Sequence, residues 1–307
     1  MTTLVVGRGL LGSQVVRAIA AGSGPVSTVP VPWHDPDSAF ASLERALRAA
    51  EQGTSWRMAW CAGAGVIATR PEQLHAEVAL FERVLSSIRT PPESFFLSSS
   101  AGGVYAGSPA GAPFDELSPT RAMAPYGEAK LLMEDAARRL AERGSRVVLG
   151  RIANLYGPGQ DLSKPQGLVS QLCLSGLTRQ PLSVYASLDT LRDYVFAPDA
   201  GRMVQACLDR ISAESAGTVS VKVLASGTAV SISELIGAVT RLFRRRPRLS
   251  TRPAPNQVRD LRLRSVLWPE VDQHAQTPLI AGLGATVADI RRQMLAGDFT
   301  SLVRAGS

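Results

Sequence analysis

Side chains that could carry out acid–base chemistry gather in one part of the sequence. The apolar run FFL at 95–97 ends in three serines, 98–100, and Tyr126 and Lys130 follow downstream. Residues four apart share one face of a helix, so Tyr126 and Lys130 are expected to lie side by side. A lysine ammonium beside a phenol favours the phenolate, which makes the tyrosine usable as a general acid or base. The sequence therefore predicts a catalytic tyrosine beside a serine hydroxyl that holds the substrate oxygen.

A glycine-rich turn near the N-terminus is suited to binding phosphate groups. The stretch VVGRGLLG lies between an expected strand at 2–7 and an expected helix at 10–22. Glycines at this spacing allow a tight turn and the close approach of a pyrophosphate, and the helix N-terminus offers free N–H groups. We predict that a dinucleotide binds here, on Gly7, Arg8, Gly9, Leu10, Leu11 and Gly12.

The choice between NAD and NADP depends on the charges near the adenosine ribose. Proteins that bind NAD usually carry an acidic residue at the end of the second strand. The expected second strand, at 26–32, has no carboxylate before Asp35. Arg8 lies within the glycine turn, where a guanidinium could pair with a 2′-phosphate. We predict NADP, with NAD as the alternative in which Asp35 binds the ribose hydroxyls.

Apolar runs alternate with helical patterns along the first half of the chain. Such alternation predicts a parallel sheet with helices on both faces, a Rossmann-type doubly wound α/β fold. Ligands bind such sheets beyond the carboxyl ends of the strands. The clusters at 7–12, 63–65 and 98–103 all follow expected strands, so they are expected at one edge of the sheet.

The periodic pattern loosens after about residue 157. We expect residues 1–156, with about 184–215, to form the dinucleotide-binding domain. Residues from about 157 to 183 and from 216 to 307 are expected to form a smaller α/β lobe that binds the substrate.

Composition narrows the class of protein. A hydrophobic share of 45% and a charged share of 19% are typical of a soluble globular protein, and no apolar run is long enough to span a bilayer. The N-terminal stretch has no basic segment before its apolar run, so we expect no signal peptide, a cytoplasmic location and no membrane partner. The three cysteines and three histidines lack the spacing of metal ligands, so no metal site is expected.

The net charge of +7 owes much to the run RLFRRRPRL at 241–249. This run has no interleaved aromatic residues, and no nucleic-acid-binding motif accompanies it. We expect a solvated loop and no nucleic-acid partner. A mildly basic surface also suits an anionic small-molecule substrate.

The chain resembles the extended short-chain dehydrogenase/reductase family, the NAD(P)-dependent epimerases, dehydratases and reductases of nucleotide-sugars. The resemblance covers nearly the whole length and rests on these segments: VVGRGLLG, FFLSSSAGGVYAG, PYGEAK, RIANLYGPG, RDYVFAPDAGRMV, ASGTAVSISELI and TPLIAGLGATV. It implies that Tyr126 is the catalytic acid/base and that Lys130 orients the nicotinamide ribose. It also implies further cofactor contacts from Cys61, Ala62, Gly63, Ser98 and Ile152.

The resemblance also implies residues that bind the substrate. Asn154 would line the substrate pocket, or else act as a turn-stabilising amide. Arg192 would meet the diphosphate of a sugar nucleotide, or else form a surface ion pair with Asp193 or Asp199. Ser100 and Tyr126 would contact the substrate directly.

Several positions depart from the family pattern. The serine loop is one residue longer than in the family pattern. Counting forward from the strand places the catalytic hydroxyl at Ser100, whereas counting back from Val104-Tyr105 reaches Ala101. We choose Ser100, with Ser99 as the second candidate. The Asp-Glu pair of the 4,6-dehydratases is replaced by Ala101 and Gly102, so dehydration is not expected.

Other departures concern the cofactor and the substrate lobe. Val6 stands where the family loop has a further glycine, and Arg8 stands where the NADP-using GDP-fucose synthase branch has its own arginine. In the substrate lobe, the segment ASLDT at 186–190 and Arg264 replace residues that the family usually has, so a standard sugar-nucleotide substrate is not assured.

These observations favour an NADP-preferring ketoreductase acting on a nucleotide-linked deoxy keto-sugar. The first alternative is a nucleotide-sugar 4-epimerase that holds NAD tightly. The second is a non-catalytic dinucleotide sensor, against which the intact Tyr126 and Lys130 argue. A homodimer is expected, because helices at 72–89 and 119–143 match those that pair in family dimers.

Overall fold

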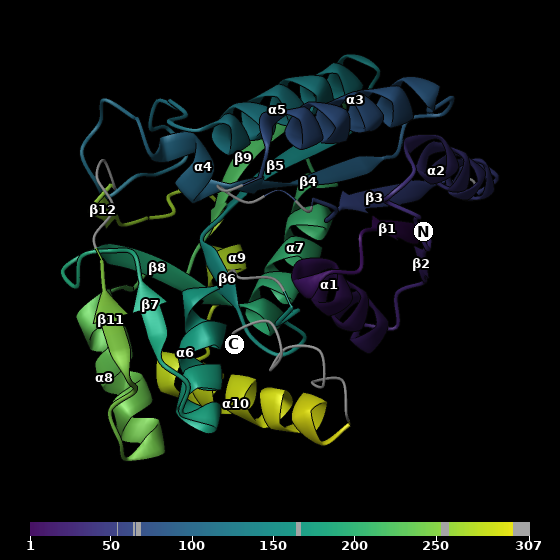
Figure 1. The fold of residues 1–307 in the computed structure, drawn as a ribbon. Coiled ribbons are helices and arrows are strands. Elements are labelled where there is room, and N and C mark those ends of the chain that lie inside the picture. Colours follow the sequence, from purple (N-terminus) through teal and green to yellow (C-terminus); the bar gives the residue numbers. More distant parts are fainter. Residues whose placement is uncertain (54, 64, 66–68, 164–166, 253–257, 297–307) are drawn as a thin grey trace.

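The structure, a computed structural model, describes residues 1–53, 55–63, 65, 69–163, 167–252 and 258–296. Six strands form one sheet in the order β2-β1-β3-β4-β5-β9 (Figure 1), and every neighbouring pair is parallel. Their bounds are β1 (Thr2–Val6), β2 (Val26–Thr28), β3 (Trp56–Trp60), β4 (Ser94–Ser100), β5 (Arg146–Ile152) and β9 (Val219–Leu224). The predicted doubly wound α/β fold is confirmed.

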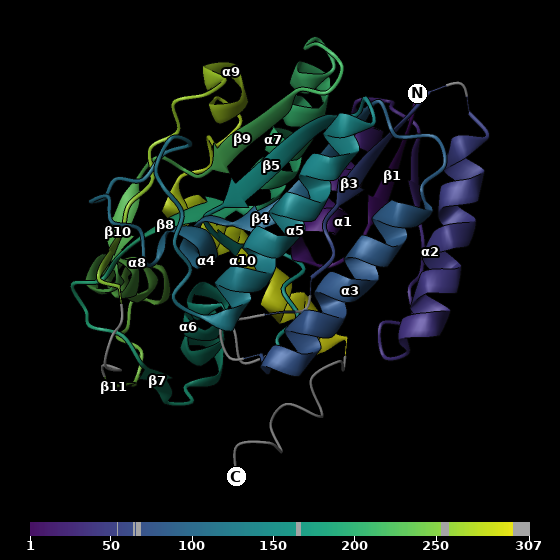
Figure 2. The same ribbon diagram turned by 90° about the horizontal axis from the view of Figure 1, so that it is seen from above.

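Helices cover both faces of this sheet, as Figures 1 and 2 show. One face carries α2 (Pro36–Glu51), α3 (Pro71–Ser87) and α5 (Pro125–Glu142), and the other carries α1 (Leu10–Ala21) and α7 (Ala197–Ile211). Alternate strand residues point to opposite faces. In β4, for example, Phe95 and Leu97 join the core under α3 and α5, whereas Phe96 joins the core with α1 and α7.

The chain winds in one direction from β1 to β2 and in the other from β3 onward. The change of direction falls between β1 and β3, which lie side by side in the sheet. Ligands bind doubly wound sheets at such a point, beyond the carboxyl ends of the strands. The glycine turn after β1 and the segment Cys61–Gly63 after β3 flank this point.

The smaller lobe consists of short strands and three longer helices. A mixed sheet joins β10 (Ala229–Ser231), β8 (Leu191–Phe196) and β12 (Asp260–Leu261), and β7 (Leu182–Val184) pairs with β11 (Leu249–Thr251). The helices are α6 (Leu168–Thr178), α8 (Ile232–Phe243) and α10 (Leu279–Leu295), and they share one apolar core. Among the described residues, two short helices complete the structure: α4 (Ala101–Tyr105), which directly follows β4 of the main sheet, and α9 (Pro269–Asp272).

Several elements differ from the sequence expectation: β2 ends at Thr28 rather than at residue 32, and α5 begins at Pro125 rather than at residue 119. The apolar stretch RVVLGRIANLYG at 146–157 forms two strands, because the chain leaves the main sheet after Ile152 and β6 (Asn154–Tyr156) pairs with β8. The sixth strand of the main sheet, β9, lies within the stretch 216–307 that the sequence assigned to the smaller lobe. Its apolar pattern is interrupted by Lys222, which is buried and paired with Asp272.

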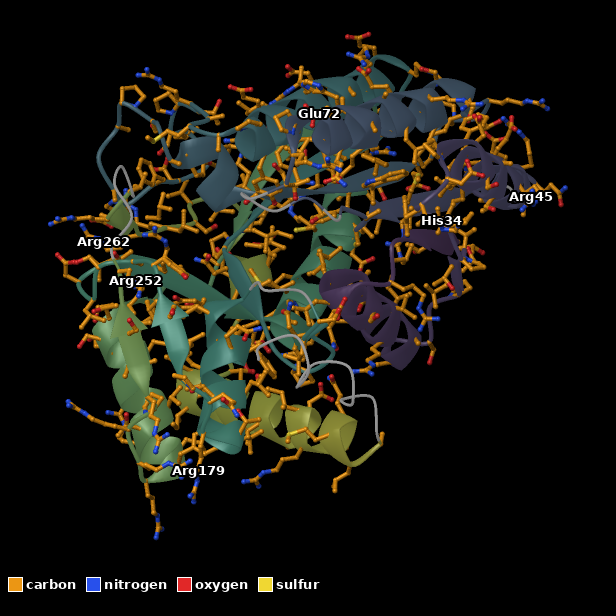
Figure 3. All side chains as sticks on the ribbon, viewed as in Figure 1. His34, Arg45, Glu72, Arg179, Arg252 and Arg262 are labelled. Carbon is orange, nitrogen blue, oxygen red and sulfur yellow. The ribbon has the colours of Figure 1, made fainter. Side chains whose placement is uncertain are left out.

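Exposed arginines gather on the smaller lobe. Arg179, Arg252 and Arg262 lie on that side of the molecule, whereas Arg45 on α2 and His34 just before it lie on the opposite side (Figure 3). The basic run at 241–249 spans the end of α8 and the start of β11, and all five of its arginines are exposed. No helix within the described residues has the length and apolar character needed to cross a bilayer.

Candidate active site

The glycine turn after β1 packs tightly against the end of β3. Gly7 has φ +88°, a conformation that side chains rarely adopt, and a Cβ there would lie 2.5 Å from the Ala62 nitrogen. A Cβ on Gly12 would lie 1.8 Å from the Gly7 carbonyl oxygen and 3.1 Å from the Cys61 Cβ. Only glycine fits these two positions, so the turn holds the start of α1 against the sheet.

The outer side of the same turn is open. Gly9 caps α1, and a Cβ there would have no atom within 4 Å. The first helical bond runs from the Ser13 N–H to the Gly9 carbonyl, so the N–H groups of Leu10, Leu11 and Gly12 have no helical partner. The first turn of α1 contains no acidic residue. Free N–H groups beside open space fit the pyrophosphate of a dinucleotide.

Arg8 and Asp35 differ in whether their charged groups already have partners within the protein. Arg8 is exposed, and its guanidinium pairs with no carboxylate among the described residues. Asp35 caps α2, where its carboxylate accepts the Ser38 hydroxyl at 2.5 Å and the Asp37 N–H at 3.2 Å. The hydrogen bond from Ser38 lowers the pKa of Asp35. Each oxygen of the carboxylate that was the candidate ribose ligand thus already accepts one hydrogen bond at the start of α2.

The two candidate serines have different surroundings. Ser99 is buried, and its hydroxyl donates to Glu134 Oε1 at 2.6 Å. Glu134 in turn pairs with buried Arg151 at 2.7 Å. Ser100 is half-buried and caps α4, where its hydroxyl oxygen accepts the Gly103 N–H at 3.2 Å. The Ser99 hydroxyl is thus committed to a buried ion pair, whereas the Ser100 proton remains available to a ligand.

Tyr126 and Lys130 lie on α5, which packs closely against α4. A Cβ on Gly127 would lie 2.2 Å from the Gly103 carbonyl oxygen, and one on Gly103 would lie 3.2 Å from Tyr126 Cε1. Gly103 therefore contacts both the Ser100 hydroxyl and the Tyr126 ring. Lys130 Nζ lies 5.7 Å from the centre of that ring. The sequence did not single out Gly103 or Gly127 as the contact that brings these elements together.

The segment after β3 lies beside Lys130. Gly63 has φ +155°, and a Cβ there would lie 3.0 Å from Lys130 Nζ. Burial raises the pKa of the Cys61 thiol to about 12, so this thiol is not a reactive thiolate near neutral pH. Ser98 and Ile152 lie near the carboxyl ends of β4 and β5, the strands on the far side of β3 from the glycine turn.

Glu77 is a neighbour of this group that sequence reasoning missed. Its Oε1 lies 3.4 Å from Lys130 Nζ. A signal was present in the sequence, because Glu77 interrupts the apolar face of α3 next to Leu74 and Val78, both of which are buried.

Asn154 and Arg192 bond to neighbouring backbone. Asn154 Nδ2 donates to the Asp193 carbonyl at 2.9 Å. The Arg192 guanidinium donates to the carbonyls of Val258 at 2.7 Å and Leu191 at 2.8 Å. Burial lowers the pKa of Arg192. The two side chains thus join β6 to β8, and β8 to the segment before β12.

The expected alternative of an ion pair from Arg192 to Asp193 or Asp199 is wrong. Asp199 pairs with Arg202 at 2.6 Å. Asp193 is buried, and one of its oxygens accepts the Ser226 N–H at 2.8 Å. Its other oxygen has no partner among the described residues, and burial raises the pKa of Asp193 to about 6.

The residues that the structure describes include no cluster of three histidine, cysteine or acidic side chains that could hold a metal ion. The candidate site therefore consists of a phosphate-binding turn and, along the same sheet edge, a hydroxyl, a phenol and an ammonium group. Such a set can transfer a proton next to a bound dinucleotide.

The sequence profile of the NAD dependent epimerase/dehydratase family matches residues 3–221. The chain belongs to this family, which confirms the predicted resemblance and, at the level of the family, the expectation of an NAD-dependent enzyme. It is similar to the dTDP-4-dehydro-6-deoxyglucose reductase of Escherichia coli, with 28% identity over 170 residues. That match covers 55% of this chain and 50% of the reductase, so the chain spans about half the length of this curated relative.

Solved structures share the fold over almost the whole chain. UDP-glucose 4-epimerase of Thermus thermophilus, in complex with NAD, is 23% identical with a TM-score of 0.76, covering 95% of this chain and 99% of that one. UDP-glucose-4-epimerase of Stenotrophomonas maltophila, with bound NAD and formylated UDP-arabinopyranose, is 18% identical with a TM-score of 0.82, covering 96% and 99%. At these identities the likeness defines the fold.

Proposed function

We propose that the chain is an NADP-preferring reductase that reduces the keto group of a nucleotide-linked deoxysugar. The observation that carries this proposal is the contact of Gly103 with both the Ser100 hydroxyl and the Tyr126 ring, with Lys130 four residues further along α5. These groups lie along the sheet edge that also carries the open glycine turn. This set of groups can protonate a carbonyl oxygen beside a bound dinucleotide.

Each side chain has a separate role in the proposed reaction. A dinucleotide held at the glycine turn would supply the hydride that reduces the carbonyl carbon. The Tyr126 hydroxyl gives its proton to the carbonyl oxygen, and the Ser100 hydroxyl donates a hydrogen bond to the same oxygen. The Lys130 ammonium holds the nicotinamide ribose and stabilises the phenolate left on Tyr126.

Reduction is favoured over dehydration because no carboxylate follows Ser100. Ala101 packs in the core and Gly102 has no side chain, so neither can remove a proton from a sugar carbon. The similarity to a reductase of a dTDP-linked deoxy keto-sugar supports the same interpretation. A 4-epimerase with tightly held NAD is the second candidate, favoured by the structural likeness to epimerases with bound NAD.

The preference for NADP rests on Arg8 and Asp35. The Arg8 guanidinium is exposed and without a carboxylate partner among the described residues, so it can pair with a 2′-phosphate. Asp35, whose charge would repel that phosphate, is held at the start of α2 by Ser38.

We further propose a homodimer through α3 and α5. Exposed Leu132 supports it, although Phe81 and Met133 pack in the chain's own core.

Two measurements on the purified protein test the reaction. The first identifies any co-purified cofactor by mass spectrometry and absorbance. The second follows reduced cofactor during incubation with a dTDP-linked 4-keto-6-deoxysugar. Net consumption of NADPH in proportion to the ketone supports the reductase. Interconversion of two sugars by protein that never releases its NAD would replace this proposal by the epimerase.

A further inference from the structure

Helices α3 and α5 are joined by two pairs of opposite charge. Glu77 Oε1 lies 3.4 Å from Lys130 Nζ, and Glu82 Oε1 lies 2.7 Å from an Arg139 nitrogen. The side chains of the first pair are 22% and 7% exposed, whereas those of the second are 45% and 57% exposed. Water screens the second pair, so it contributes little. The first pair is largely shielded, so its charges act strongly on their neighbours.

The Glu77 carboxylate lies against the same backbone as the proposed catalytic groups. A Cβ on Gly63 would lie 3.0 Å from Lys130 Nζ and 3.1 Å from Glu77 Oε1. A Cβ on Gly65 would lie 3.4 Å from Tyr126 Cδ2 and 3.5 Å from Glu77 Oε2. Because Gly63 and Gly65 have no side chains, the Glu77 carboxylate, the Lys130 ammonium and the Tyr126 ring can all pack against this segment after β3.

Lys130 depends on few other contacts. Its ammonium has three donors, and among the described residues it has two acceptors, Glu77 Oε1 and the Met133 sulfur at 3.8 Å. Sulfur is a weak acceptor, so Glu77 is the group that compensates the buried positive charge. A flexible lysine side chain without that partner would occupy several positions.

We propose that Glu77 is a positioning residue whose carboxylate fixes the Lys130 ammonium where it can reach both the nicotinamide ribose and Tyr126. This inference rests on the proposed function. Glu77 contacts neither the substrate nor the reacting atoms, and it acts through Lys130. Held by Glu77, the ammonium would stay within reach of both the ribose and the Tyr126 ring, whose centre lies 5.7 Å away.

The test compares Glu77→Gln with Glu82→Gln, a matched control that removes the other charge pair between the same two helices. Glutamine keeps the size of the side chain and one acceptor oxygen but removes the charge. Affinities for NADPH and for ADP are measured by titration on both variants and on wild type. ADP lacks the nicotinamide and its ribose, so it reports on the binding of the adenosine and the diphosphate without the contact to Lys130.

We expect Glu77→Gln to weaken NADPH binding about 3- to 10-fold, since one charge-assisted contact is partly lost, and to leave ADP binding unchanged. Glu82→Gln should match wild type for both ligands. Equal NADPH affinities in wild type, Glu77→Gln and Glu82→Gln would overturn the inference. Thermal unfolding of each variant shows that it is folded, and this binding comparison needs no turnover.

The pH profile of keto-sugar reduction gives a second readout that a purely structural role would not change. Among the described residues, the charged and titratable groups in contact with Lys130 are Glu77 from α3 and Tyr126 from its own helix. Without Glu77 the ammonium no longer keeps its place beside the phenol, so the phenolate loses its stabilising cation. The pH at which reduction declines should therefore rise by roughly half a unit to one unit. An unchanged profile, or a fall, would show that Lys130 keeps its place without Glu77 and would count against the inference.

The two proposals fail in different ways. If wild type binds NADPH but reduces no keto-sugar, the proposed function fails, while the NADPH and ADP affinities still decide the role of Glu77. If wild type reduces the sugar and Glu77→Gln does so with the same rate, affinity and pH profile, the positioning role fails and the proposed function stands.

Discussion

The proposed cofactor side and the proposed substrate side of the candidate site are held together by different kinds of contact. On the cofactor side, glycines allow backbone segments to meet: Gly7 and Gly12 close the first turn, and Gly103 joins Ser100 to Tyr126. On the substrate side, Asn154 and Arg192 donate to carbonyls of neighbouring strands. The cofactor side thus leaves its polar groups free for ligands, whereas the substrate side uses its donors to connect its own strands.

This contrast indicates which groups can do chemistry without rearrangement. The Ser100 proton, the free N–H groups of α1 and the Arg8 guanidinium have no competing partner among the described residues. Arg192 would have to give up bonds to Val258 and Leu191 before it could bind a diphosphate. Substitutions on the cofactor side should therefore change activity, and those on the substrate side should first change stability.

The largest effect is expected at Tyr126. Tyr126→Phe removes only the hydroxyl and keeps the ring contact with Gly103, so folding should be preserved. Turnover should fall at least ~100-fold, the low end for loss of general acid–base catalysis. Steady-state kinetics with the keto-sugar and NADPH measure it. Near-normal turnover would remove Tyr126 from the mechanism.

Substitutions of the neighbouring Ser99 and Ser100 should affect different properties, stability for Ser99 and turnover for Ser100. Ser100→Ala should lower turnover about 10- to 100-fold, because a hydrogen bond to a developing charge is worth about 1.5–3 kcal/mol. Ser99→Ala should leave the Glu134–Arg151 pair without one buried partner and lower the free energy of unfolding by about 1–3 kcal/mol. Kinetics and urea denaturation of both variants distinguish the two roles. The reverse pattern would show that Ser99 is the catalytic serine.

Arg8→Ala tests the charge on the open side of the glycine turn. Because the guanidinium is exposed, solvent weakens its pairing, and we expect the preference for NADPH over NADH to fall by about 10-fold. Titration of both reduced cofactors against wild type and variant measures this. Equal losses for the two cofactors, or a wild type that prefers NADH, would show that Arg8 does not contact the 2′-phosphate.

The smallest effect is expected on the substrate side, at Asp193. Its pKa is raised from 3.8 to about 6 by burial, so the folded protein binds this proton more tightly than the unfolded chain does. As the pH falls through about 6, protonation removes the cost of the buried charge. Asp193→Asn keeps the acceptor for the Ser226 N–H but cannot titrate.

Wild type should therefore gain about 1 kcal/mol of stability relative to Asp193→Asn between about pH 7 and about pH 5. Urea denaturation of both proteins at several pH values measures this difference. A difference that stays constant with pH would mean that Asp193 keeps its charge throughout that range.

Features fixed by local backbone requirements could be predicted from the sequence. The glycine turn, the serines at the end of β4 and the spacing of Tyr126 and Lys130 each depend on a short segment. Their common position at one sheet edge follows from the strand–helix alternation. The sequence alone therefore predicts both the family and the fold class correctly.

Features fixed by partners far away in the chain could not. Whether Ser99 or Ser100 is free depends on Glu134 in α5, and the partner of Lys130 lies in α3. The break at Ala153 follows from pairing of β6 with β8, which is separated from it by α6 and β7. Strand β9 was missed because buried Lys222 interrupts its apolar pattern, and its partner Asp272 lies in α9.

A deuterium label follows the proposed hydride transfer from cofactor to sugar. NADPH carrying deuterium at both positions on C4 of the nicotinamide ring is incubated with the protein and a dTDP-linked 4-keto-6-deoxysugar, and the sugar is analysed by mass spectrometry and NMR. We predict one deuterium on the new carbinol carbon, lost from the cofactor in equal amount. A sugar that is changed without gaining deuterium, or a ketone that stays unreduced while NADPH is bound, would contradict the account.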